Sequence, residues 1–370
     1  MDPYPRTWAV VDLRCLRDNL AYVRAQMGTS PVQIALVAKA DAYGHGLLPV
    51  CRFAATNGAD AIAVATVQEG VSLREAGVEV PVMVMSPILP AECDQAVFYN
   101  LEVFVENATL AKAMDSAAAK QSRTARLHLK VDTGLHRYGC PPKDASTIAH
   151  DIDGYSNTKL VGLCQHFSDS SADEASTAKQ LWIFEQALKE CRARSVKFEQ
   201  VHMANSGAAI KYPASRGTMV RVGVLAYGVD PFGLTAGSVR PVSSWFGRVL
   251  SLRMVPAGAK LGYAGTYTTS RQTVVATVGV GYGDGYTRAL SNKGFTAVNG
   301  QKAAVIGLVC MDQMLIDVTG ITDVGIGTVV ELIGPNVSAT ELAKLAGTNA
   351  HEILTNVTAR VPRRYVYPDM

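Results

Sequence analysis

The sequence predicts an α/β barrel followed by a predominantly β domain. Three observations indicate this: the apolar runs, the helical segments between them, and a change in the pattern near residue 239. In the first 230 residues, eight short apolar runs alternate with segments of helical spacing. This alternation is typical of a (β/α)8 TIM-type barrel, in which helices cover a ring of parallel strands. From about residue 239, strand follows strand with glycine-rich turns and no long helix. A succession of strands without a long helix predicts an all-β C-terminal domain.

The expected barrel strands are β-branched, apolar runs at 32–38, 60–65, 81–85, 101–105, 125–131, 158–165, 198–203 and 219–226. Helical spacing between them is clearest at 13–26, 66–76, 106–120 and 173–193. The last of these segments is strongly amphipathic and has acidic residues in its first turn, which complement the positive end of a helix dipole.

In the second part of the chain, strands are expected at 249–255, 273–280, 296–298, 304–309, 314–318 and 328–333. Two short helices (338–346 and 350–356) and a strand at 365–367 follow. A strand at 7–13 precedes the first barrel helix, so we expect it to pair with the C-terminal domain. The predicted domains are therefore a barrel at 12–236 and a β domain at 237–370 that includes the N-terminal strand within 1–11.

Composition excludes several classes of function. The net charge of the 370-residue chain is +3 and its basic residues are scattered, which argues against nucleic-acid and membrane-surface partners. Its seven cysteines are widely spread and contain no Cys-x-x-Cys pair, so neither a disulfide framework nor a metal site is expected. With no apolar leader and no long apolar stretch, we expect a soluble protein of a reducing cytoplasm.

The first candidate functional residue is Lys39, which ends the apolar run at 32–38. Burial favours the neutral form of a lysine amine, and a neutral amine is a nucleophile that condenses with carbonyls. The alternative is a lysine whose charge reaches solvent from a strand end. Four residues later, Tyr43 begins a Gly-His-Gly turn whose backbone can approach a ligand closely.

Polar residues also end four other apolar runs. Taken singly, each has a structural explanation, such as a hydrogen-bonded core histidine or a buried ion pair. Because the carboxyl ends of barrel strands meet at one mouth, we expect the polar residues there to form one site. They are Lys130 with Asp132 and Arg137, then His166, Asn205 with Ser206, and Arg221.

Seven motifs occur in a characteristic order and spacing: VAKADAYGHG, KVDTGLHRYG, HMANSGA, MVRVGVLAYG, KLGYAGTYTT, GVGYGDGYTRALSN and VCMDQMLIDVT. With them the chain resembles the alanine racemase family, the fold-type III pyridoxal-phosphate enzymes, over essentially its whole length. The resemblance implies interconversion of L-alanine and D-alanine, which supplies D-alanine for peptidoglycan.

The resemblance also implies two bases. Lys39 would hold pyridoxal 5'-phosphate covalently and act as one acid/base. Racemisation removes a proton from one face of a planar carbanion and returns one to the other, so a second group is needed opposite. Tyr263 matches the second base, which in the family reaches the active site of the other subunit. A head-to-tail homodimer with shared active sites is therefore implied.

The remaining roles carry over residue by residue. For the cofactor, Arg221 matches the group facing the pyridine nitrogen and His166 the residue packed against the ring. Tyr43, Ser206 and Gly223 match the phosphate cradle, with Asn205 adjacent. Around the substrate, the matches are Arg137, Met311 and Asp312 at the carboxylate and Tyr282 at the entrance. Lys130 matches a lysine that is often carbamylated to N6-carboxylysine; an unmodified lysine paired with a carboxylate is the alternative.

Two departures from the family pattern leave the substrate open. Two extra polar residues lie between His166 and Glu174. Ala359 occupies the position before Arg-Val-Pro-Arg where many members carry a tyrosine at the inner gate. A missing ring there would widen the pocket, so a serine or dual alanine/serine racemase is the alternative function.

Two further classes share the cofactor. Decarboxylases of basic amino acids combine a barrel with a β domain, but they lack the tyrosine base, so Tyr263 and Arg221 argue against them. Single-barrel proteins that only carry pyridoxal phosphate end near the point where this chain begins its β domain.

Overall fold

The structure, a computed structural model, describes residues 5–368, so residues 1–4 and 369–370, both ends of the predicted β domain, lie outside the described residues. An eight-stranded parallel sheet in the order β8-β7-β6-β5-β4-β3-β2-β9 forms the first domain. The amide of Thr218 donates to Val201 O (2.9 Å) and that of Arg221 to Ala204 O (3.0 Å), which joins β9 to the segment around β8. The predicted (β/α)8 barrel is therefore confirmed. Its strands are β2 (Gln33–Val37), β3 (Ala61–Val64), β4 (Val82–Val84), β5 (Glu102–Val105), β6 (Ala125–Lys130), β7 (Thr158–Cys164), β8 (Gln200–His202) and β9 (Met219–Val222).

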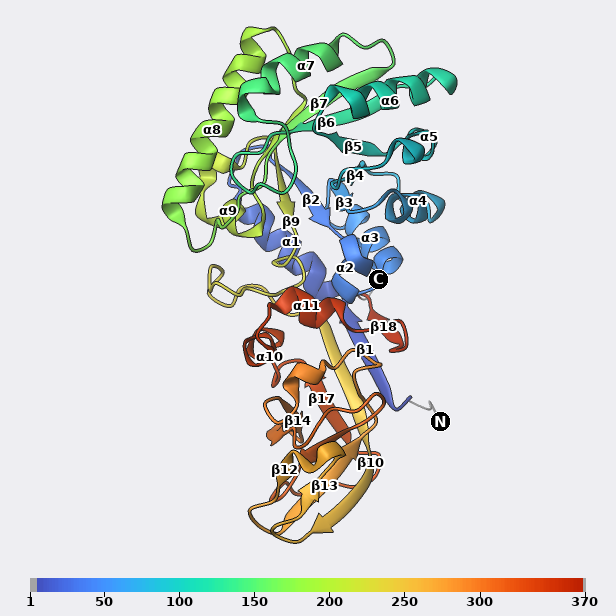
Figure 1. The fold of residues 1–370 in the computed structure, drawn as a ribbon, viewed down its shortest axis with the longest axis vertical. Helices are drawn as coiled ribbons and strands as arrows, with labels where there is room; N and C mark the ends of the chain where they lie inside the picture. Colours follow the sequence, from blue (N-terminus) through green and yellow to red (C-terminus); the bar gives the residue numbers. More distant parts are fainter. Residues whose placement is uncertain (1–4, 369–370) are drawn as a thin grey trace.

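Helices cover the outside of this barrel (Figure 1). Several begin at a residue whose side chain accepts a hydrogen bond from a free amide of the first turn, as Asp12, Thr66, Asn107 and Asp173 do. The helices that helical spacing predicted begin and end within two residues of expectation. The barrel helices are α1 (Leu13–Gln26), α3 (Leu47–Thr56), α4 (Val67–Glu75), α5 (Cys93–Phe98), α6 (Ala108–Lys120), α7 (Ala145–Asp153), α8 (Glu174–Ala193) and α9 (Ser206–Lys211).

The second domain is built on a mostly antiparallel sheet in the order β15-β14-β17-β10-β1-β18, to which β13 and β16 attach beside β10. The N-terminal strand β1 pairs antiparallel with β10 and parallel with β18, so the first and the last strand of the described chain lie in this sheet. Figure 1 shows β1 and the long β10 running side by side. The elements are β1 (Thr7–Asp12), β10 (Ser243–Val255), β11 (Lys260–Leu261), β12 (Tyr267–Thr268), β13 (Thr273–Val278), β14 (Phe295–Val298), β15 (Gln301–Ala304), β16 (Met314–Asp317), β17 (Val329–Ile333), α10 (Ala339–Ala346), α11 (Ala350–Thr355) and β18 (Arg363–Val366).

The strand predicted at 304–309 is wrong. The strand of this region is β15, which ends at Ala304, and the apolar residues that follow are buried in a loop. Gly307 interrupts the run with φ +81°, a left-handed conformation that no strand contains. An unbroken apolar pattern thus indicated burial there but not strand geometry.

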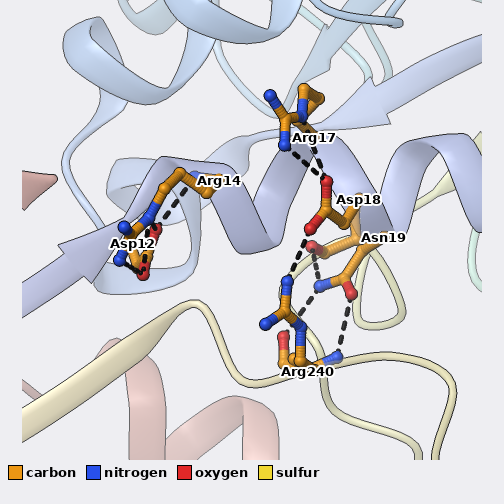
Figure 2. A network of polar contacts seen from close by, with 7 residues as sticks. Asp12, Arg14, Arg17, Asp18, Asn19 and Arg240 are labelled. Atoms are coloured by element: carbon orange, nitrogen blue, oxygen red, sulfur yellow. Dashed lines mark hydrogen bonds and ion pairs between the residues drawn. The ribbon is translucent and has the colours of Figure 1, made fainter. Parts of the chain in front are cut away.

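A buried amide holds the connection between the two domains (Figure 2). The Asn19 side chain in α1 donates to Ala226 O (3.0 Å) and Arg240 O (2.8 Å) and accepts from the Arg240 amide (2.9 Å). The Arg240 guanidinium also donates to Asp18 (2.5 Å). These contacts fix the linker against the barrel before β10 begins. Among residues 5–368, no helix is long and apolar enough to span a bilayer.

Candidate active site

Lys39, two residues after the end of β2, begins a turn of left-handed helix. Ala40 to Tyr43 have φ between 53° and 55°, and none of these four residues is glycine. Each left-handed L-residue costs about 1–2 kcal/mol, so the surrounding structure has to hold this turn. Conformations of this kind cluster at ligand-binding and catalytic sites.

Contacts from several elements stabilise the turn. Glu69 of α4 accepts a hydrogen bond from the Ala40 amide (2.7 Å), and Asp41 accepts one from the Leu47 amide (2.7 Å). From the C-terminal domain, the Arg363 guanidinium donates to Gly44 O (3.0 Å). Gly44 itself has φ +78°, and a Cβ there would overlap a backbone carbonyl of α11. Lys39 is therefore positioned by both domains.

A cavity of about 750 Å³ opens at the carboxyl ends of the barrel strands, a volume suited to a cofactor together with a small substrate. Nine residues predicted from the sequence line it, contributed by the ends of five strands and the segments that follow them. They are Lys39, Tyr43, Lys130, Arg137, His166, Asn205, Ser206, Arg221 and Gly223. The polar strand ends thus form one site.

The electrostatics of the cavity favour a neutral amine at Lys39. Partial burial lowers the pKa of this lysine, and the Arg137 guanidinium lowers it further, whereas Glu69 acts in the opposite direction. The amine is therefore free to act as a nucleophile or base over a wider pH range than an exposed lysine.

Arg221 is buried and donates to protein acceptors on two sides of its guanidinium group. One nitrogen donates to His202 Nδ1 (2.7 Å), and the other donates to Gln165 O (2.7 Å) and to His166 Nδ1 (3.2 Å). Burial and the charge of Arg221 lower the pKa values of His166 and His202 well below the usual range. Both imidazoles are therefore neutral acceptors beside a permanent cation.

A chain of hydrogen bonds continues from Arg221 across the barrel interior. Since His202 Nδ1 accepts from Arg221, its Nε2 carries the hydrogen and donates to His128 Nδ1 (3.0 Å). His128 Nε2 then donates to Glu102 (2.9 Å), which also accepts from Arg126 (2.7 Å). Gly162 leaves room for the His128 ring, because a Cβ there would overlap Nδ1. Every donor points toward the Glu102 carboxylate, which fixes both tautomers and the orientation of Arg221.

Gly223, which follows β9, forms a cradle with Ser206, which begins α9, and with Tyr43. The Gly223 amide donates to Ser206 Oγ (2.9 Å), and a Cβ on Gly223 would lie 2.6 Å from the Tyr43 hydroxyl. The Asn205 side chain caps α9 and accepts from Ser170 Oγ (2.8 Å). Hydroxyls grouped around a position that admits no side chain fit a phosphate group.

Lys130 is buried at the floor of the cavity. Its ammonium donates to Tyr138 O (2.6 Å) and lies 4.0 Å from the centre of the Tyr138 ring. Burial lowers its pKa, and the charges of Arg137 and Arg221 add to that effect. Among the described residues no carboxylate forms an ion pair with Lys130, and the charge of Asp132 only partly offsets the lowering of its pKa.

Several lining residues escaped sequence reasoning. Asn349, His351 and Thr355 reach the cavity from α11 and its N-cap, and the His351 ring lies 5.6 Å from that of Tyr43. Tyr138 was overlooked although it adjoins Arg137. Ser168 to Ser171, in the extra polar segment after His166, also line the cavity.

Six predicted residues do not line this cavity within one chain: Asp132, Tyr263, Tyr282, Met311, Asp312 and Ala359. Tyr263, Met311 and Tyr282 are 73%, 54% and 42% exposed. The amides of Tyr282 and Gly283 donate to Cys310 O and Met311 O, which joins two of the loops involved. Asp312 pairs with Arg360 (2.5 Å), the neighbour of Ala359. The expectation that Ala359 lies at an inner gate of the cavity is thus not met within one chain.

Comparison with known proteins covers nearly the whole chain. The family model for the alanine racemase N-terminal domain matches residues 11–231, and that for the alanine racemase C-terminal domain matches residues 242–365. Alanine racemase of Halothermothrix orenii is 39% identical over 97% of this chain and 96% of its own.

Solved structures of alanine racemases also match nearly the whole chain. Alanine racemase from D-cycloserine-producing Streptomyces lavendulae superposes with a TM-score of 0.93 at 30% identity, covering 99% of this chain and 98% of its own. Alanine racemase from Bartonella henselae, determined with covalently bound pyridoxal phosphate, has a TM-score of 0.90 at 25% identity, covering 98% of this chain and 100% of its own.

Proposed function

Because the chain belongs to the alanine racemase family, we propose that it interconverts L-alanine and D-alanine with pyridoxal 5'-phosphate as its cofactor. The observation that carries this proposal is the cavity in which Lys39, Arg137 and Arg221 converge with the hydroxyl cradle. When bound, the cofactor supplies a carbonyl for covalent attachment and an electron-withdrawing ring that acidifies the hydrogen on the substrate α-carbon.

Lys39 holds the cofactor and moves the α-hydrogen on one face of the substrate. Support for this role comes from its lowered pKa and from the contacts that fix the turn it begins. Tyr43, Ser206 and Gly223 hold the phosphate, with Asn205 keeping α9 in place beside them. His166 packs against the ring.

Arg221 would face the ring nitrogen of the bound cofactor and keep its own proton, because a guanidinium does not deprotonate in proteins. Without a proton from Arg221 the ring would withdraw electrons only weakly, which would favour return of the α-hydrogen over transamination or decarboxylation.

Arg137 binds the substrate carboxylate, and carbamylated Lys130 orients Arg137. A neutral buried amine reacts with carbon dioxide, and the resulting anion would balance the positive charges of Arg137 and Arg221. The lowered pKa of Lys130 and its lack of an ion-pair partner among the described residues support this modification.

Tyr263 of a second subunit acts on the opposite face, with Met311 and Asp312 at the substrate carboxylate and Tyr282 at the entrance. The aromatic and apolar side chains among them are exposed on neighbouring loops. This exposure supports their contact with a second subunit, since clustered exposed apolar residues mark interfaces. The proposed assembly is a head-to-tail homodimer with two shared sites.

The names of the relatives favour alanine over the serine alternative and over the decarboxylases. The serine alternative depends on Ala359, which does not line the cavity of its own chain. We place the enzyme in the cytoplasm, where it supplies D-alanine for peptidoglycan; its cysteines are free among the described residues, as is usual in reducing compartments.

Chiral chromatography of reactions started from L-alanine tests the reaction. Equal amounts of the two enantiomers are expected at equilibrium, with kcat/KM for L-serine at least tenfold lower. A serine value equal to that of alanine, or release of carbon dioxide in place of D-alanine, would contradict the proposal.

Mixing two inactive variants tests the shared site. Lys39→Ala and Tyr263→Phe homodimers should each be inactive, and Tyr263→Phe should keep its bound cofactor. After exchange of subunits, half of the dimers are mixed and each contains one intact site, so about one quarter of wild-type activity should return. If Tyr263 served its own chain, every mixed site would lack one base and no activity would return.

A further inference from the structure

The polar segment 168–171 lies directly against the start of α9. A Cβ added at Gly207, the second residue of this helix, would lie 2.8 Å from Ser171 Oγ and 3.4 Å from Ser170 Oγ. Ser206, a residue of the proposed phosphate cradle, comes immediately before Gly207. The hydroxyl groups of the segment are therefore close neighbours of the cradle.

Hydrogen bonds on both sides of Ser171 hold this segment in place. The Ser168 amide donates to Gln180 Oε1 of α8 (3.1 Å), and Ser168 Oγ accepts from Gln180 Nε2 (2.6 Å). Ser170 is buried, and its Oγ donates to Asn205 Oδ1 (2.8 Å) at the start of α9. The segment is thus tied to two helices, and the hydroxyl of Ser171 is not needed to hold it.

The hydroxyl hydrogen of Ser171 is available to a ligand. The Ser171 amide donates to Asp169 Oδ1 (3.3 Å), but among the described residues Ser171 Oγ makes no hydrogen bond. Ser206 Oγ accepts from the Gly223 amide (2.9 Å), which leaves its own hydrogen for another acceptor. Both serines line the cavity at the barrel mouth. Two hydroxyl hydrogens near the start of α9 can therefore be donated to a group in the cavity.

An anion with several oxygen atoms suits this arrangement. The hydroxyls surround two glycine positions, Gly207 and Gly223, where the missing side chain lets a ligand approach the backbone closely. A phosphate group has three acceptor oxygens. It can therefore accept from a further hydroxyl without losing its hydrogen bonds to Ser206 and Tyr43.

We propose that Ser171 is a further cofactor-binding residue, whose hydroxyl donates to the phosphate of pyridoxal 5'-phosphate beside Ser206. This assignment rests on the proposed function, with the phosphate held at Gly223, Ser206 and Tyr43. A hydrogen bond to a charged oxygen is stronger than one between neutral groups, so its loss should weaken binding of the phosphate about tenfold. Ser171 thus serves the cofactor and not the side chain of the substrate.

Pyridoxal 5'-phosphate and pyridoxal form a matched pair of probes, since pyridoxal has the same ring and aldehyde but no phosphate. Each is titrated into the full-length enzyme after removal of the cofactor, and the absorbance of the bound probe gives its Kd. Ser171→Ala should bind pyridoxal 5'-phosphate about tenfold more weakly and pyridoxal as the wild type does. The control Ser176→Ala, on α8 outside the cavity lining, removes another serine hydroxyl near Gln180 and should change neither Kd.

Gly207→Ala tests the same hydroxyl from the side of α9, because its Cβ would displace Ser171 Oγ. This variant should also bind pyridoxal 5'-phosphate more weakly and pyridoxal unchanged. The double variant with Ser171→Ala should bind no more weakly than the weaker of the two single variants, since both changes remove one contact. Losses that multiply in the double variant would overturn the proposal.

Ser171 is not a phosphate ligand if Ser171→Ala binds pyridoxal 5'-phosphate as the wild type does, or if it raises only the KM for L-alanine. An equal loss of affinity for both probes would also overturn the proposal, because it would show a change in the shape of the site. These results leave the proposed function intact. Wild-type enzyme that binds the two probes equally would instead contradict the phosphate cradle, and the proposed function with it.

Discussion

Replacing the carboxylate at the end of the hydrogen-bond chain, Glu102→Gln, should destabilise the protein in a strongly pH-dependent way. Burial raises the pKa of Glu102, but the hydrogen bonds from His128 and Arg126 and the charge of Arg126 outweigh it and bring the pKa down to about 2, from 4.5. Each whole step of pKa difference corresponds to about 1.4 kcal/mol, so the ionised carboxylate contributes about 3 kcal/mol to folding at neutral pH.

The sign follows from the lowered pKa. A carboxyl group whose folded pKa is depressed contributes its full stability above the unfolded pKa and loses it as the pH falls toward the folded pKa. Glutamine resembles the protonated acid and makes no such contribution. The difference between wild type and Glu102→Gln should therefore be about 3 kcal/mol at pH 7 and roughly half of that at pH 3.

Urea unfolding at fixed protein and cofactor concentration measures this difference. Glu199→Gln is the matched control, because Glu199 pairs with the same Arg126 (3.0 Å) from a side chain that is 43% exposed. An exposed pair contributes at most about 1 kcal/mol, so this control should change stability little at either pH. If Glu102→Gln cost no more than Glu199→Gln, or cost the same at both pH values, the chain of donors ending at Glu102 would not be as described.

Three further predictions concern the cavity at the barrel mouth. Gly223→Ala should fold but bind the cofactor at least tenfold more weakly, because its Cβ would lie 2.6 Å from the Tyr43 hydroxyl. The absorbance of bound cofactor after gel filtration measures this loss. The control Gly325→Ala, with open space around its Cβ, should behave as wild type. Glu69→Gln should move the acid limb of the pH profile of kcat/KM to lower pH, since Glu69 raises the pKa of Lys39. The control Glu75→Gln, on the same helix, should not move it. An unmoved limb in Glu69→Gln would contradict the electrostatic account. Removal of dissolved carbon dioxide should lower the activity of the wild type several-fold, and bicarbonate should restore it. Lys130→Met should respond to neither treatment. If the wild type also responded to neither, a carbamate would be excluded.

The barrel was predictable because its signal is local. Strands buried on both faces are continuous apolar runs, and amphipathic helices between them repeat every 3.6 residues. Short elements without such a signal were missed, including α3, α5 and α9. The false strand at 304–309 shows the limit of the same reasoning, since burial of an apolar run does not determine its backbone conformation.

Some residues of the candidate site are likewise predictable from the sequence, and others are not. Those at strand ends could be grouped from sequence, because parallel strands bring their carboxyl ends to one mouth. His128, His202 and Glu102 could not, since each reads as an ordinary strand residue until strand register places them side by side. Tyr263 and Met311 entered only through resemblance to the family, and no pattern in the sequence predicts the proposed contribution of such exposed loops to a site in a second chain.

The left-handed turn after Lys39 was beyond prediction for a physical reason. Four consecutive non-glycine residues at φ near +54° cost about 4–8 kcal/mol together, so no local preference of the sequence favours them. The turn exists because distant groups hold it: Glu69 from α4, and Arg363 and Tyr365 from β18, which bond to Gly44 O and His45 O. The C-terminal domain therefore has a role within its own chain, besides the one proposed for it toward a second subunit. It also fixes the lysine of its own barrel, so a barrel expressed without β18 should lose the geometry of Lys39 even where its strands still form.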